Sequence, residues 1–313
     1  VSQAGHLEQL DRIGAGLRLR IKPYVIGGVS QLPNDHSGST YLENNSQVGI
    51  EDIKIAITPS ITADITVNPD FAQAEVDQSM VNMTRFSLFI NEKREFYLEG
   101  ARVFDFGAAR TGRSSRPPEV IAFYSRRIGL KDSNQVPILG GAKLTGDIDG
   151  FQFGAINMQT RSQEGLAGSN FGVLRIKRRL LKRSYVGGIV TNASMTEEGG
   201  ANRVAGIDGN FVLFDKLTLF GFFAESESGD KKDSNQAYQG QARWRSDTVE
   251  VDIHRLSIGK NFSPETGYIR RNDTTKHLVR FGWRPRPGNK SWIRQYHLTT
   301  THTWFTSHRD FME

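Results

Sequence analysis

The chain has 313 residues, no cysteine and a formal net charge of +6, with 40 Lys and Arg against 34 Asp and Glu. The lack of cysteine excludes disulfide frameworks, thiolate metal sites and cysteine nucleophiles. Only 37% of the residues are hydrophobic, and no apolar run approaches the roughly 18 residues that a membrane-spanning helix requires. The sequence therefore excludes a helical membrane protein. Its 32 Gly and 19 Phe at low mean hydropathy fit a transmembrane β-barrel instead.

The first part of the chain is expected to contain strands over residues 17–25, 53–58 and 61–67. Residues 68–107 then break the strand pattern, because charged and aromatic side chains crowd together there. Such a segment would be unfavourable against lipid, so it is expected to pack against protein as a plug or a cap. Asp77 is expected to cap a short helix that runs to Met83.

A basic loop with several turn-forming residues spans 110–118, and a strand is expected to resume over 120–127. The pair Pro117-Pro118 marks the predicted internal boundary. It divides the chain into 1–118, with the insert 68–107, and 119–313, an array of β-hairpins.

The hairpin array shows period-2 alternation. Val249, Val251 and Ile253 fall on one face of a strand, while Glu250 and Asp252 fall on the other. Ten strands are expected at 139–145, 150–160, 169–179, 182–192, 203–213, 217–225, 237–245, 248–258, 276–284 and 292–304. Short turns near 148, 181, 215 and 246 alternate with longer polar loops, as in outer-membrane barrels. The sequence predicts an all-β fold: an incomplete antiparallel up-and-down transmembrane β-barrel with a charged, aromatic insert. A soluble lipocalin-like barrel or β-sandwich is the alternative.

Three segments carry a resemblance to a known family. Asn68 to Gly107 contains LFINEKREFYLEG, and FYSRRIG (Phe123 to Gly129) and GAKLTG (Gly141 to Gly146) follow. Together they resemble a large bacterial outer-membrane family with a β-barrel domain of unassigned function, commonly placed after a carbohydrate-binding module of the family-nine type. Asn91 and Glu95 stand where that family usually has proline. The resemblance implies that the chain is an internal piece of a longer protein, or a truncated member.

Catalytic motifs for a serine nucleophile elbow, a zinc helix, a P-loop and a dinucleotide fold are absent from the sequence. No cofactor or metal is therefore expected. Glu92, Glu95 and Glu99 are the candidates for a glycosidase pair of carboxylates, but basic residues alternate with them and favour an ionic network. The residues predicted to form a binding site or an ionic network in the lumen are Arg85, Glu92, Lys93, Arg94, Glu99, Arg126 and Arg127.

These observations lead to a functional hypothesis. The chain is expected to be an outer-membrane β-barrel protein of a bacterial cell that binds or passes a glycan or another polar solute. The alternatives are a cell-surface hydrolase acting on carbohydrate and a structural or assembly partner in an outer-membrane complex. Expected partners are the lipid bilayer, lipopolysaccharide, a glycan ligand and other outer-membrane proteins. The basic run 175–183 has no interleaved aromatic residues, so nucleic acid is not expected to bind.

Overall fold

The computed structural model describes residues 18–33, 40–69, 83, 86–107, 119–131, 134–162, 168–195, 200–229, 233–288 and 292–307. Within these ranges antiparallel strands dominate. Helical structure there is limited to α2 (Glu95–Leu98) and two 3-10 turns, η1 (Ala101–Phe104) and η2 (Ser125–Arg127). None of the described helices is long and apolar enough to cross a membrane.

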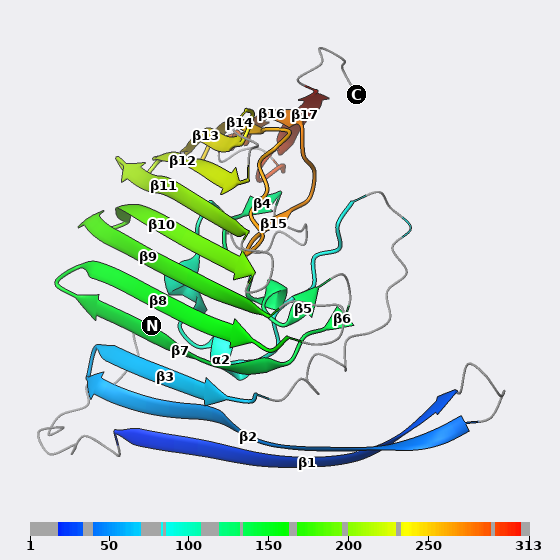
Figure 1. The fold of residues 1–313 in the computed structure, drawn as a ribbon. Helices are drawn as coiled ribbons and strands as arrows, with labels where there is room; N and C mark the ends of the chain where they lie inside the picture. The colour runs from blue at the N-terminus through cyan, green and yellow to red at the C-terminus, as the bar shows by residue number, and fades with distance from the viewer. Residues whose placement is uncertain are drawn as a thin grey trace, which may run out of the picture.

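A single 13-stranded antiparallel sheet forms the body of the molecule (Figure 1). Its strands follow chain order, so each pairs with its sequence neighbour in the sheet. They are β1 (Leu19–Pro33), β2 (Thr40–Thr58), β3 (Ile61–Val67), β7 (Ile138–Ile148), β8 (Phe151–Thr160), β9 (Ser169–Leu181), β10 (Ser184–Met195), β11 (Ala201–Leu213), β12 (Leu217–Ser228), β13 (Gln236–Arg245), β14 (Val249–Ile258), β16 (Thr274–Trp283) and β17 (Leu298–Thr306). Two small ladders lie outside it: β4 (Val120–Ile121) with β15 (Tyr268–Ile269), and β5 (Leu130–Lys131) with β6 (Asn134–Gln135).

The sequence located most of these strands. β3 has the expected bounds, and β7 to β14 lie within a few residues of the expected ranges. β2 begins at Thr40, well before the expected residue 53. The expected helix from Asp77 to Met83 lies almost wholly outside the described residues, which include Met83 alone from that range.

The expected strand over 120–127 is wrong beyond Ile121. Tyr124 donates its backbone N–H to Thr266 O at 2.8 Å, and Ile128 donates back to Ser125 O at 2.9 Å. The chain therefore turns into η2 after β4, because its backbone hydrogen-bonds to the loop after β14. Residues 120–127, expected as one strand, instead contain the two-residue strand β4 and the 3-10 turn η2.

The expected antiparallel up-and-down sheet is present, and among the described residues it does not close into a barrel. β1 and β17 each pair with one neighbour only, so the described sheet has two free edges. β3 pairs directly with β7, from Val67↔Gly140 to Ile61↔Gly146. The residues between them, 68–137, are therefore an insertion between adjacent strands, and strands on both sides of residue 118 share one sheet.

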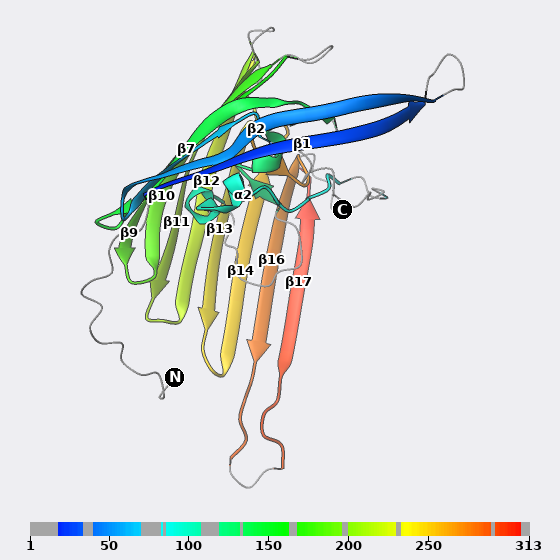
Figure 2. The same ribbon diagram turned by 90° about the horizontal axis from the view of Figure 1, so that it is seen from below.

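The two faces of the sheet differ in character. On β9, Leu174 and Ile176 are about half exposed, whereas Arg175 between them is fully buried. The same alternation continues on β11, where Ile207 is exposed and Asp208 is buried. The outer face is thus apolar, whereas the inner face carries buried charged side chains alongside the buried hydrophobic core. Figure 2 shows the sheet curving around α2, which lies inside the curve.

Candidate functional site

The insert and the loop after β14 together cover part of the inner face. Aromatic side chains of the insert join the buried core with side chains from β8 to β14. Gly154 of β8 makes room for this packing, because a Cβ there would lie 2.6 Å from Cζ of Phe104. Gly100 joins α2 to η1 at φ 69°, a conformation that glycine adopts without strain. These glycines let the insert turn sharply and seat its aromatic rings on the sheet.

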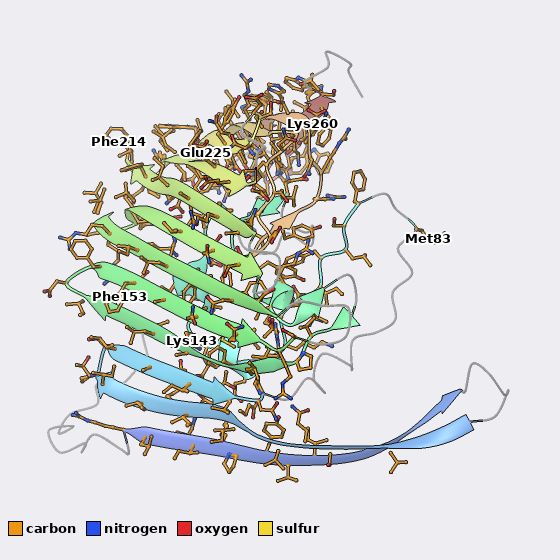
Figure 3. All side chains as sticks on the ribbon, in the orientation of Figure 1. Met83, Lys143, Phe153, Phe214, Glu225 and Lys260 are labelled. Carbon is orange, nitrogen blue, oxygen red and sulfur yellow. The ribbon has the colours of Figure 1, made fainter. Side chains whose placement is uncertain are left out.

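A cluster of charges joins the insert to β1, β2, β3 and β7. Asp64 is buried and lies 3.1 Å from Lys143 Nζ and 3.6 Å from Lys54 Nζ. Lys54 also contacts the Glu99 carboxylate, and Lys143 donates to the backbone oxygens of Phe96 and Glu99. Figure 3 shows Lys143 on β7 beside the segment that carries α2. Opposite charges from sheet and insert thus meet on the inner face.

Three carboxylates of this charge cluster are close enough to hold a metal ion. Ligand atoms of Asp52, Asp64 and Glu99 lie within 4.8 Å of one another. Each is already matched by a cation: Arg20 Nη2 lies 2.7 Å from Asp52, and the lysines contact the other two. The arrangement therefore fits an ionic network better than a cation site.

A second ion pair lies within the insert, and its members hydrogen-bond to η2 and to Ile128. Arg94 Nη2 lies 2.7 Å from Glu92 Oε2, and both side chains are about nine-tenths buried. Arg94 also donates to the backbone oxygens of Ile128 and Ser125, each at 2.9 Å, and its guanidinium lies 4.3 Å from the centre of the Tyr97 ring. The Ser125 hydroxyl donates to Glu92 at 2.6 Å. This group, Glu92, Arg94 and Ser125, is called the latch below.

The electrostatics of the carboxylates bear on catalysis. Burial alone would raise the pKa of Glu92, but hydrogen bonds and charge from Arg94, with help from Ser125, hold that pKa below its usual value. The hydrogen bond from Lys22 lowers the pKa of Glu95. A glycosidase acid requires a raised pKa. The environments of Glu92 and Glu95 therefore suit ion-pair partners rather than a glycosidase acid. Glu99, the third candidate, also lies among cations.

The remaining predicted residues are dispersed around the latch. Arg126 is buried and its Nη1 lies 3.4 Å from Asn91 O, while Arg127 Nε donates to Gly267 O at 3.1 Å. Lys93 is exposed, and its backbone N–H donates to Glu92. Arg85 lies outside the described residues. The structure thus brings Glu92, Arg94 and Arg126 to one side of the insert, with Glu99 on the side of β1 to β3.

Sequence reasoning missed a buried pair in the middle of the sheet. Arg175 of β9 lies 2.7 Å from Asp208 of β11, and both side chains are completely buried. The Tyr185 hydroxyl contacts Asp208 at 3.2 Å, and the Arg175 guanidinium lies 5.2 Å from the centre of the Phe106 ring in the insert. In the sequence, Arg175 belongs to the basic run 175–183 near the turn. Its alternation with Leu174 and Ile176 was the available signal that it faces inward.

A comparison with protein families finds one match. Residues 15–147 match a family model described as a domain of unknown function, DUF5916. The matched region runs from the start of β1 nearly to the end of β7 and includes the whole insert. Among curated proteins nothing matches the chain. The first part of the chain is therefore similar to a domain whose function is unassigned, and that similarity includes both the insert and the strands that flank it.

Proposed function

We propose that this chain is part of an outer-membrane β-barrel protein that binds or passes a polar solute, with a glycan as the best chemical fit. The observation that carries the proposal is the contrast between the two faces of the sheet. Exposed apolar side chains such as Val190, Ile253 and Phe281 cover the outer face. Buried charged side chains such as Asp252 and Lys143 lie on the inner face. Strands of a membrane barrel alternate in this way between lipid and lumen.

A polar strip on β13, β14 and β16 supports a role for the inner face in solute binding. It consists of Gln241, Arg243, Glu250, Asp252 and Arg284. Gln241 and Arg243 each donate to Asp252 at 2.8 Å, and Arg284 pairs with Glu250. Amide, guanidinium and carboxylate groups present several planar hydrogen-bonding positions, which match the hydroxyls of a sugar. The strip therefore offers a hydrophilic wall for a polar solute.

The insert would control access to this wall. It packs on the inner face through aromatic rings and is held by the latch and by the charge cluster around Asp64. A plug of this kind permits large flux only after it moves. The closed arrangement predicts low basal flux, which increases when the packing of the insert is disturbed.

The test is solute flux in liposomes. The full-length protein is reconstituted, and its insertion is first established by heat-modifiable migration on unheated gels. Swelling is then compared for sugars of increasing size. Gly154→Leu, which pushes a side chain into the position of Phe104, is expected to raise flux. Gly240→Leu is the matched control, because no atom lies within 4 Å of a Cβ there. Insertion without sugar flux or sugar binding in any variant would contradict the solute role.

The free edges of the sheet favour a second candidate, a structural or assembly role. β1 and β17 each leave one side unpaired within the described sheet, and such edges readily pair with further strands. A stoichiometric complex in the outer membrane that passes no solute in liposomes would favour this role over transport.

A further inference from the structure

A groove of about 730 Å³ lies on the outer face of the sheet over β9 to β12. It is separate from the insert, which packs on the opposite face. Five exposed apolar side chains line it: Ile176, Val186, Ile207, Leu219 and Phe223. An apolar surface that is hollowed, rather than merely flat, can hold a ligand of defined shape.

The floor of the groove lacks side chains because glycines coincide across strands. Gly209 of β11 pairs with Gly221 of β12, and Gly221 pairs with Gly240 of β13. On either side of this row lie the pairs Ile207↔Phe223 and Phe211↔Leu219. These flanking rows are two residues away from the glycines, which is about 7 Å along a strand. The result is a narrow trough across the strands between two apolar walls.

One end of the groove carries positive charge. Two charged residues line the groove, but the Asp208 carboxylate is turned inward to Arg175, which leaves Arg178. The Arg178 guanidinium lies 4.1 Å from the centre of the Phe151 ring and donates one hydrogen bond to the backbone oxygen of Asp149. Lys182 follows in the next turn and is exposed.

Arg178 and Lys182 have no ion-pair partner within the described part of the chain. Asp147 lies 2.7 Å from Arg179, and Asp215 lies 4.0 Å from Arg183. The Asp149 carboxylate is exposed. It forms no ion pair within 4.0 Å with Arg178, Arg179, Lys182 or Arg183. In Figure 3 the labelled Phe214 marks the adjacent turn between β11 and β12. The short-turn end of the groove therefore combines an apolar trough with one lining cation, Arg178, and an exposed Lys182 four residues further along the chain.

We infer that this groove binds one acyl chain of an anionic glycerophospholipid, with the phosphate held by Arg178 and Lys182. The inference rests on the proposed membrane function and adds a specific lipid site to it. An acyl chain needs no hydrogen-bond partner, and the backbone beneath the groove is already paired within the sheet. A guanidinium and an ammonium at one end supply charge-assisted hydrogen bonds to a phosphate.

The experiment separates groove filling from charge. Full-length protein is inserted into vesicles of phosphatidylcholine with a minority of phosphatidylglycerol, extracted in mild detergent and examined by native mass spectrometry for retained lipid. Gly209→Leu fills the trough and remains apolar, so insertion should be unaffected. Gly240→Leu places the same side chain in the same glycine row but outside the lining of the groove. Arg178→Gln combined with Lys182→Gln removes the charge.

The wild type and Gly240→Leu are expected to retain one phosphatidylglycerol in preference to phosphatidylcholine. Gly209→Leu and the double Gln variant are each expected to lower this retention about tenfold, the effect of losing one well-placed interaction. Equal retention in all variants, or equal retention of both lipids, would overturn the lipid site while normal insertion leaves the proposed function intact. Retention of a co-purifying protein at the groove instead of lipid would also overturn it. Failure to insert would refute the proposed function and the lipid site together.

Discussion

Replacement of Arg94 by methionine is the sharpest test of how the insert is held. Arg94 connects three parts of the site through Glu92, the backbone oxygens of Ile128 and Ser125, and the ring of Tyr97. Methionine keeps an apolar stem of similar reach but removes every donor. The Glu92 carboxylate would then be buried with the Ser125 hydroxyl and backbone N–H groups as its hydrogen-bond donors.

The expected magnitude follows from burial. Removing one partner of a buried ion pair costs about 3–5 kcal/mol, since the other charge remains without compensation. Because Arg94 and Glu92 also hydrogen-bond to Ser125 and Ile128, this cost should appear as weaker docking of the insert on η2. A loss of this size shifts the docking equilibrium by roughly two to four powers of ten.

Hydrogen exchange of the detergent-solubilised protein measures this shift. Backbone amides in 86–107 and 119–131 should exchange much faster in Arg94→Met, while those of β9 to β12 stay protected. Arg179→Met is the control, because its pair with Asp147 is 54% and 37% exposed and should be worth about 0–1 kcal/mol. Glu92→Gln together with Arg94→Met should recover part of the loss. Equal exchange in Arg94→Met and Arg179→Met would refute the assignment of the latch.

Three further results are expected. Because the folded pKa of Glu92 lies below its usual 4.5, its contribution is complete above that pH and is lost as pH falls through the folded pKa. The protection factors of the insert amides, which correct for the slower intrinsic exchange in acid, should therefore fall as the pH falls, and Glu92→Gln should flatten that dependence; protection factors that do not change with pH would contradict this. Gly154→Leu should destabilise the protein by about 1–3 kcal/mol in denaturant unfolding, because its side chain would overlap Phe104, whereas a neutral effect would mean that the ring is not seated there. Asp64→Asn should lower the free energy of unfolding by about 3–5 kcal/mol, since Lys143 would stay buried with a neutral neighbour. If Lys143→Met in the Asp64→Asn background fails to restore stability, loss of this ion pair is not the cause.

The sequence predicted the hairpin array well because period-2 alternation is a local signal. Val249, Val251 and Ile253 belong to one strand, and their exposure follows from their spacing alone. The packing of the insert against protein was also predictable. Its mixture of charged and aromatic residues is unfavourable against lipid and does not follow the alternation of a strand.

What the sequence could not give depends on distant partners. Ser125 to Arg127 form a 3-10 turn because residues near 266 bind that segment, and no local pattern encodes this contact. Likewise, Arg175 and Asp208 meet across β10 although they are 33 positions apart in sequence. Closure of a barrel is likewise non-local, because it requires the first and last strands of a sheet to meet.

The position of the insert has a consequence for assembly of the molecule. Residues 68–137 leave the sheet after β3 and return at β7, and these two strands pair with each other. The insert 68–107 lies within this segment, so the chain connects it on both sides to two neighbouring strands of the sheet. It also emerges from the ribosome before β8, which Phe104 approaches, and before β9, β11 and β12, which Phe106 approaches. Until those strands form, its aromatic rings have no partner surface, so the exposed rings make the chain most prone to aggregation at this stage of folding.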